Sequence, residues 1–526
     1  MQNEENQNLK DNRMAKRDGL RGFIGGMNQS GEIQTRDLSK RKNRGAPKSS
    51  LTLNQRDQSI RGYLSKLERA GEIVCIEKEV DPQENMGAIQ WRAYDELGKA
   101  SRFTNIKGFP SWEACSQILT DRNKWALGLN LTPDEILRAM SKKLKNPIEP
   151  ELTSGPGSPC KEVIKKDDEA SLLDIPAVIQ SERDGGAFIS AGMAILKDPD
   201  TGLRNVSIHR MQVFDAKHSG FILLPRQARR IHEKYLKQGR NTPVAVVVGS
   251  HPAIFFGSAY TTSFGVDELS IAGGILGEPV RMVKAETVDV EVPADAELVL
   301  EGEILVGERR YEGPYGEVPG TYAEAEDAEV FRVTAITHRK DPIYYSLHSG
   351  LPTTCAQATT GFGIEIATME HLSKVEGGMD IHDVRVLPAG GLMLLIIKIT
   401  PKVEGQAKTA LMAALSGPYL HPKLAIAVDD DIDASDLRQI MWSMTTRVHA
   451  ERDIGMINNT RTFALDKISP IAEDGGQFER LGTKWFIDAT KPALSNPEKR
   501  ANFDRAMPKN FSSTNIQDFL PKDVLI

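Results

Sequence analysis

The sequence lacks any long uninterrupted apolar segment, and this absence argues against a membrane-spanning helix. Its strongest apolar run, residues 391–397, ends at Lys398. That length is far short of the roughly 20 apolar residues that cross a bilayer, and it favours a buried strand instead. The polar first residues also lack the apolar core of a secretory signal.

Cysteine is scarce, and so is net charge. The four cysteines are scattered along the chain without a CxxC pair, which indicates neither a disulfide framework nor a zinc site. The formal net charge is only -6 over 526 residues. Nucleic acid is therefore not expected as a partner, because binding to its phosphates needs a concentrated basic surface. We expect a protein of the reducing cytoplasm that binds neither nucleic acid nor membranes.

Length and composition predict a globular chain of several domains. The hydrophobic content of 40% and charged content of 26% are ordinary, and a chain of this length exceeds a single core. Residues 1–58 are polar and lack apolar periodicity, which predicts a disordered tail. We expect an N-terminal α/β domain at 59–150, a strand-rich domain at 151–345, an α/β domain at 346–500 and an extension at 501–526 that docks on a neighbouring subunit.

Local apolar spacing predicts the main elements. The N-terminal domain is expected to contain a helix from Ile60 that ends before Gly71, a strand at 73–76 and a helix within 133–145. The expected strands of the middle domain are 192–196, 206–214, 244–248, 288–292 and 329–338, with a helix at 226–238. Beyond residue 351, strands at 392–399 and 424–428 alternate with helices at 405–415 and 434–445, which indicates a second α/β layer structure.

The motif EGPYGE, residues 312–317, holds two carboxylates at a separation set by the backbone. Pro314 fixes one backbone angle, and the glycines permit conformations that are closed to other residues. Glu312 and Glu317 in unequal surroundings can take different pKa values, which is how a general acid is provided. Taken alone, however, an acidic turn of this kind is more often a surface hairpin, so other residues must decide.

A strand is predicted over residues 205–215, with Arg210 on the same face as Val206 and Ile208. If that face points inward, the guanidinium needs an acid such as Glu312, because an unpaired buried charge costs several kcal/mol. The alternative is an edge-strand arginine in water. Asn205 has the opposite parity, so it shares a site with Arg210 only if it lies at the strand end or a bulge intervenes.

Further acidic and basic residues lie at the ends of apolar segments. Asp267 and Glu268 precede an apolar helix, where they serve either as caps or as ligands of a hard cation. Lys423 stands at one end of a buried strand and either neutralises a phosphate or is solvated. The aspartates 429–431 at the other end either bind a divalent cation or cap a helix before Ala434.

Taken together and in this order, five motifs resemble the UbiD family of reversible decarboxylases over roughly residues 59–490. They are NVSIHR (205–210), VDELSIAGGILGE (266–278), VPADAELVLEGEI (292–304), EGPYGE (312–317) and KLAIAVDDDID (423–433). The resemblance implies a mixed α/β fold with an N-terminal α/β domain, a central split β-barrel that binds a flavin and a C-terminal α/β domain that takes part in oligomerisation. It also implies a homodimer or homohexamer.

The resemblance implies the activity as well. The expected reaction is the reversible, non-oxidative decarboxylation of an aromatic, heteroaromatic or α,β-unsaturated acid through a covalent adduct with prenylated FMN, which a flavin prenyltransferase supplies. The residues of the motifs NVSIHR and VDELSIAG are closer to those of the aryl and heteroaryl acid branches of the family than to those of the polyprenyl-hydroxybenzoate branch. Arg210, Glu312 and Glu317 match the family's Glu-Arg-Glu network. Glu317 is expected to be the acid and base, and Glu312 the ionised partner that orients Arg210.

Cofactor and metal residues are likewise implied by the resemblance. Asn205 and Glu268 match ligands of a divalent metal, manganese or magnesium, that ties the flavin phosphate to the protein. The family's third ligand, commonly histidine, is replaced by Gln227, a neutral oxygen ligand, and the adjacent Arg226 adds positive charge. The expected cofactor-binding residues are Asn205, Ser207, Ile208, His209, Arg210, Arg226, Gln227, Ser258 at a potassium site, Glu268 and the phosphate-binding Lys423.

Two alternatives remain open at this stage. The chain is either a decarboxylase or a non-catalytic subunit that binds prenylated FMN within a carboxylase complex. Gln227 favours the subunit, whereas the intact set of Arg210, Glu312 and Glu317 favours the enzyme. A decarboxylase of a coenzyme A thioester or of a phosphorylated aromatic is a further possibility.

Overall fold

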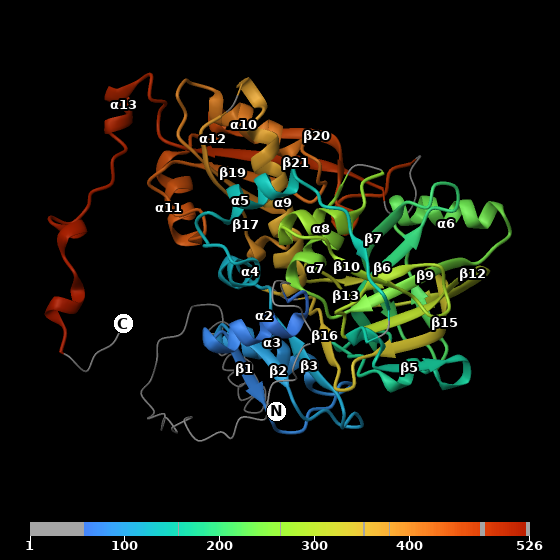
Figure 1. Ribbon diagram of the computed structural model, residues 1–526. Helices are drawn as coiled ribbons and strands as arrows, with labels where there is room; N and C mark the ends of the chain where they lie inside the picture. Colours follow the sequence, from blue (N-terminus) through green and yellow to red (C-terminus); the bar gives the residue numbers. More distant parts are fainter. Residues whose placement is uncertain are drawn as a thin grey trace, which may run out of the picture. The chain divides into compact units, whose positions relative to one another are not determined.

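The computed structural model describes residues 57–155, 157–262, 265–350, 353–377, 379–473 and 479–521. The predicted disordered tail, residues 1–58, lies outside this part except for Asp57 and Gln58. The chain from Asp57 onward forms one compact unit of the mixed α/β class that the sequence predicts (Figure 1). None of the helices described is long and apolar enough to cross a membrane.

The first sheet contains strands from two distant parts of the chain. Its order is β1 (Ile73–Ile76), β2 (Ala100–Phe103), β3 (Glu113–Ser116) and β16 (Ile343–Ser346). The helices of this region are α2 (Ile60–Arg69), α3 (Met86–Leu97), α4 (Arg122–Leu129) and α5 (Ile136–Leu144). α2 forms as predicted, because Ser59 caps it and its apolar residues at helical spacing are buried. The parallel pairing of β16 with β3 ties the sheet to a strand more than 200 residues later.

The central sheet has seven strands, as the strand-rich middle of the sequence predicts. Its order is β5 (Val163–Lys166), β15 (Glu326–His338), β12 (Leu298–Glu312), β9 (Thr242–Val248), β6 (Phe188–Lys197) and β7 (Arg204–Gln212), and β8 (His218–Phe221) pairs with β15. Strands β6 and β9 are almost continuously buried, which explains why apolar residues predominate in both. The pairings described do not close this sheet into a complete barrel.

Shorter elements surround the central sheet. Three helices follow β8 and β9: α6 (Gln227–Lys237), α7 (Pro252–Ala259) and α8 (Glu268–Leu276). One small sheet has the order β11 (Glu291–Pro293), β10 (Arg281–Lys284) and β4 (Glu151–Leu152), and another pairs β13 (Tyr315–Gly316) with β14 (Tyr322–Ala323). β13 belongs to the EGPYGE segment, which lies between the ends of β12 and β15.

The C-terminal sheet has helices on both faces. Its order is β17 (Ile381–Val386), β18 (Leu394–Ile399), β19 (Leu424–Val428), β21 (Arg480–Ala489) and β20 (Ile454–Thr462). Its helices are α9 (Cys355–Leu372), α10 (Gln406–Leu415), α11 (Leu437–Arg447), α12 (Ala450–Asp453) and α13 (Pro497–Ala501). Side chains of β18 alternate between the core under α9 and α10 and the core under α11. The sheet and its helices are orange to red in Figure 1, except for the yellower α9.

Of the two roles expected for the aspartates at 429–431, the helix cap is contradicted, whereas binding of a divalent cation stays a prediction, because one ligand atom from each lies within 4.8 Å of the others. α11 begins only at Leu437, where Asp436 caps it, so the predicted capping of a helix before Ala434 is wrong. Asp429 pairs with Arg500 at 2.5 Å and Asp431 pairs with Arg447 at 2.7 Å. Each of these two carboxylates contacts an arginine, and the Asp429–Arg500 pair anchors α13 to the C-terminal sheet. Among the residues described, no disulfide joins the cysteines.

Candidate active site

The two carboxylates of EGPYGE lie on either side of a sharp turn. Glu312 is the last residue of β12, and Glu317 directly follows β13. The Glu312 side chain is fully buried, with an exposed fraction of 0%. Gly220 of β8 makes room for it, because a Cβ there would stand 2.2 Å from Glu312 Oε2. The surface-hairpin alternative is therefore wrong for this motif.

The turn between these carboxylates is held by side chains from two other segments. Gln212 Oε1 accepts a hydrogen bond from the Gly313 amide at 2.7 Å, and Asp184 Oδ1 accepts one from the Gly316 amide at 2.9 Å. Gly313 has a φ of 107°, a conformation that favours glycine. The separation of the two carboxylates is thus fixed by the backbone and by hydrogen bonds to it.

Arg210 of β7 lies between the two acids. Its Nε is 3.2 Å from Glu312 Oε1, and its Nη1 donates a hydrogen bond to Glu317 Oε1. The ring of Tyr315 stacks near the guanidinium, with 5.1 Å between Cζ and the ring centroid. The predicted pairing of Arg210 with an acid such as Glu312 is present, and the solvated edge-strand alternative is wrong because the Arg210 side chain is only 19% exposed.

The protonation of Glu312 bears on the role that the sequence predicts for it. Neither of its carboxylate oxygens has a hydrogen-bond partner in the part of the chain described. Burial raises its pKa to about 7, and the opposing charge of Arg210 only partly offsets this. The raised pKa runs against the expectation that Glu312 is the ionised partner of Arg210, and that role stays a prediction. Glu317 makes the closer contact with the guanidinium.

A second buried polar group is formed by Asn205 and Glu268. Asn205 is the second residue of β7, so it lies at the strand end, which is one of the two positions expected for it. The register shift between β6 and β7 lies in β6, between Ile189 and Gly192. Its Nδ2 donates to Glu268 Oε1 at 3.0 Å, and the Val206 amide donates to Oε2 at 2.8 Å. Thr262 also donates to Glu268 through its hydroxyl, at 3.2 Å.

These residues fit a hard divalent cation. Asn205 Oδ1 is buried without a hydrogen-bond partner among the residues described, and burial raises the Glu268 pKa to about 7, with the charge of Asp267 adding to this. Gln227 is linked to this group only through Thr262, because its Nε2 donates to the Thr262 carbonyl at 3.5 Å and the Thr262 hydroxyl donates to Glu268. Two carbonyl oxygens and a carboxylate are suitable ligands for manganese or magnesium.

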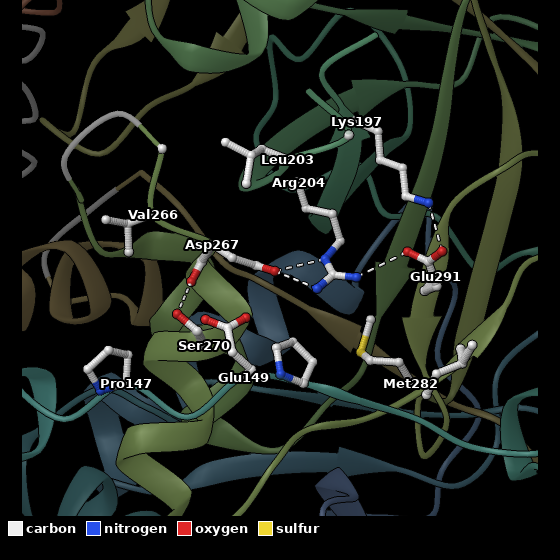
Figure 2. Close-up of a pocket in the computed structure, with 14 residues that line it drawn as sticks. Pro147, Glu149, Lys197, Leu203, Arg204, Val266, Asp267, Ser270, Met282 and Glu291 are labelled. Carbon is white, nitrogen blue, oxygen red and sulfur yellow. Dashed lines mark hydrogen bonds and ion pairs between the residues drawn. The ribbon is translucent and has the colours of Figure 1, made fainter. Parts of the chain in front are cut away.

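An ion-pair network holds the two segments that carry these residues. Arg204, next to Asn205, contacts Asp267, next to Glu268, at 2.6 Å. Figure 2 shows Arg204 between Asp267 and Glu291, with Lys197 on the far side of Glu291 at 2.7 Å. The network borders a cavity of about 580 Å³. Asp267 is also the cap of α8, as the capping alternative predicts.

His209, with Ser207, forms the next part of β7. Its Nε2 lies 2.9 Å from Ser207 Oγ and its Nδ1 lies 3.1 Å from the Ile222 carbonyl. The ring stacks on Phe221 at 4.6 Å. Burial lowers the His209 pKa to about 4, so the ring is neutral at physiological pH. Ile208, between them, is only partly buried.

Three further residues predicted to bind the cofactor, Ser258, Lys423 and Arg226, are not part of the two buried groups around Arg210 and Glu268. Ser258 donates to the Phe255 carbonyl within α7 at 2.7 Å, and Lys423 pairs with Asp466 at 2.8 Å. Arg226 is exposed and directly precedes α6. In the part of the chain described, none of the three hydrogen-bonds to Arg210 or Glu268, so their roles at potassium or phosphate stay predictions.

Sequence reasoning missed several residues that shape the site. Gln212 shares the parity of Arg210 on β7, and this was a usable signal. Asp184 comes from a loop with no periodic pattern, so nothing in the sequence placed it here. Glu326 lies directly opposite Glu312 in the β12–β15 pairing, a register that the sequence alone does not determine.

Three family models match almost the whole described chain. They are the N-terminal domain (residues 64–144), the Rift-related domain (152–352) and the C-terminal domain (358–489) of 3-octaprenyl-4-hydroxybenzoate carboxy-lyase. The phenolic acid decarboxylase of Bacillus subtilis is 30% identical over 468 residues, which cover 86% of this chain and 95% of that protein.

Solved structures agree with these matches. The UbiD-class enzyme HmfF from Pelotomaculum thermopropionicum, in complex with FMN, superposes with a TM-score of 0.81 at 33% identity, covering 88% of this chain and all of that one. An evolved dimeric form of the same enzyme with prFMN gives a TM-score of 0.77 at 32% identity, over 88% of this chain and 100% of that one.

Proposed function

This chain belongs to the UbiD family of carboxy-lyases, and we propose that it reversibly removes carboxylate from an aromatic, heteroaromatic or α,β-unsaturated acid with prenylated FMN as its cofactor. An aryl or heteroaryl acid is favoured, because a relative that aligns over most of both chains is named a phenolic acid decarboxylase. The proposal includes a flavin prenyltransferase as supplier of the cofactor, a homodimer or homohexamer, and a cytoplasmic location.

The cluster of Arg210, Glu312 and Glu317 carries this proposal. Decarboxylation leaves an electron pair on the substrate carbon, and a positioned acid must protonate that carbon. Glu317 is the more exposed of the two acids, because 11% of its side chain is accessible, whereas 0% of the Glu312 side chain is accessible. We therefore assign Glu317 as the acid and base. Arg210 orients its carboxylate, and Glu312 tunes the charge behind Arg210.

The buried group around Glu268 supports the cofactor assignment. Asn205, Gln227 and Glu268 would hold a manganese or magnesium ion that binds the flavin phosphate, with Arg226, Ser258 and Lys423 as further candidates near the phosphate and a potassium ion. Prenylated FMN, when bound, supplies an electrophilic centre that amino-acid side chains lack. The protein residues position the substrate, exclude water and move the proton.

The test is to produce the chain together with a flavin prenyltransferase and to measure carbon dioxide release from a panel of acids. Release from at least one aromatic or unsaturated acid is expected, with a loss of about 10²–10⁴-fold in Glu317→Gln, the range for removal of a general acid. Release by the variant at the wild-type rate would remove Glu317 from the assigned role. Bound modified flavin without turnover of any acid, even with manganese added, would favour the non-catalytic subunit.

Thioester and phosphorylated substrates belong in the same panel. Gln227 is the observation that keeps the non-catalytic subunit as a second candidate, because a neutral ligand in place of histidine changes how the metal is held. If carbon dioxide is released only from a coenzyme A thioester or only from a phosphorylated aromatic acid, that result would narrow the substrate class instead.

A further inference from the structure

The proposed decarboxylation consumes one proton in every turnover, and this requirement draws attention to Glu326. When the bond to the carboxylate breaks, carbon dioxide leaves and the substrate carbon takes a proton from the acid. The acid must then be reloaded from water. The inference that follows rests on the proposed function, in which that acid is Glu317, a side chain only 11% exposed.

Strand register places Glu326 beside the catalytic cluster. It is the first residue of β15 and lies directly opposite Glu312, the last residue of β12. Opposite residues of an antiparallel pair point to the same face, with Cβ atoms about 5 Å apart. The preceding residue of β12, Tyr311, points to the other face and is 74% exposed, whereas Glu312 is fully buried. Glu326 therefore shares the face of Glu312.

Burial places Glu326 at the border between the cluster and water. The side chain is partly buried, and the two residues before it, Glu324 and Ala325, are exposed. Glu312 lies behind it with no accessible surface. Glu326 is thus the carboxyl of this face that both water and the buried acid can reach.

The charges around Glu326 favour a shared proton. Burial raises the pKa of Glu326, and the nearby Glu317 adds to this, whereas Arg210 and Arg480 oppose it. Glu326 in turn contributes to the raised pKa of Glu312. Two facing carboxylates repel each other when both are ionised. Ionisation of one of the two carboxyls therefore disfavours ionisation of the other.

We propose that Glu326 takes up a proton from water and passes it through Glu312 to Glu317. In the first step a water-borne acid loses its proton to a Glu326 oxygen. That oxygen then releases a proton as Glu312 gains one. Because Arg210 lies between Glu312 and Glu317, Glu312 gives its proton to a water molecule, which releases one of its own protons to Glu317. Arg210 keeps its own protons throughout and holds Glu312 and Glu317 together. Glu326 acts only through these residues and does not touch the substrate.

The test compares Glu326→Gln with wild type in the cofactor-loaded enzyme across a range of pH. Turnover is expected to fall about tenfold, less than the roughly 10²–10⁴-fold effect of a group that transfers the proton to substrate, because Glu326 acts only through other residues. The loss should grow as the pH rises and protons become scarce. A small acid such as formic acid or imidazolium, added at high concentration, is expected to restore the rate. Glu326→Asp keeps the carboxyl and should retain most activity.

The matched control is Glu324→Gln, which removes an exposed carboxylate two residues away that pairs with Lys467 at 3.3 Å. Its turnover should equal that of wild type. The proposal is overturned if Glu326→Gln keeps the wild-type rate at every pH, or if its loss is not restored by any small acid.

A second readout separates this proposal from the proposed function. Wild-type enzyme that releases no carbon dioxide from any acid would refute the function and leave the shared proton to be tested in the cofactor-free protein. There, the infrared band of protonated Glu312 should disappear at lower pH in Glu326→Gln than in wild type, because the facing charge has been removed. An unchanged titration would overturn the shared proton as well.

Discussion

Replacing Glu312 with glutamine should remove a pH dependence from the stability of the folded protein. Burial raises the pKa of this carboxyl from 4.5 to about 7. Because its folded pKa lies above the unfolded value, its contribution to stability is fully present below about pH 4.5 and is lost as the pH rises through about 7. At about 1.4 kcal/mol per pKa unit, the raised pKa makes the loss about 3 kcal/mol by about pH 8.

The assay is denaturant unfolding of the cofactor-free protein at several pH values across this window. Glu312→Gln keeps the shape of the side chain and leaves Glu317 to pair with Arg210, so the variant should gain up to about 3 kcal/mol on wild type as the pH rises. A chain of this length need not unfold in one step, so each transition is compared separately. Glu324→Gln is the control and should follow wild type. A constant difference between Glu312→Gln and wild type would refute the reasoning, because Glu312 would then be ionised throughout.

Three further predictions concern the metal site and the fold. Arg204→Met should weaken manganese binding to the FMN-loaded protein about 10–100-fold, whereas Lys197→Met, at the outer end of the same network, should not; electron paramagnetic resonance titration measures both. Gln227→His should tighten manganese binding in the same titration, and unchanged affinity would show that this side chain is not a ligand. Arg122→Met should lower the unfolding free energy by about 3–5 kcal/mol, because Glu365, which is 8% exposed, would lose its cation.

The periodic parts of the fold could be predicted from the sequence. The helical spacing from Ile60 and the unbroken apolar run of β9 carry their own secondary structure, because burial of one face or of both faces determines the pattern. The run at 391–398 behaves as a buried strand, although β18 begins only at Leu394, after a turn in which Gly391 and Leu392 have φ angles of 55° and 71°.

The site could be predicted only in part, and there is a physical reason why its other features could not be predicted. Arg210 needed an acid because a buried guanidinium does, and the two acids of EGPYGE were the candidates. The protonation of Glu312 could not be read from the motif, because its pKa depends on burial under β8 and on Glu326 across the sheet. Both depend on strand register, which only the assembled sheet determines.

The most direct test of the central claim follows hydrogen exchange at the carbon that carries the carboxylate. The decarboxylated product is incubated in D2O with the cofactor-loaded enzyme, and deuterium at that carbon is measured by NMR. Wild type should exchange this position, and Glu317→Gln should lose the exchange by at least about 10²-fold, because the same group must remove and return the proton. Exchange by Glu317→Gln at the wild-type rate would contradict the account.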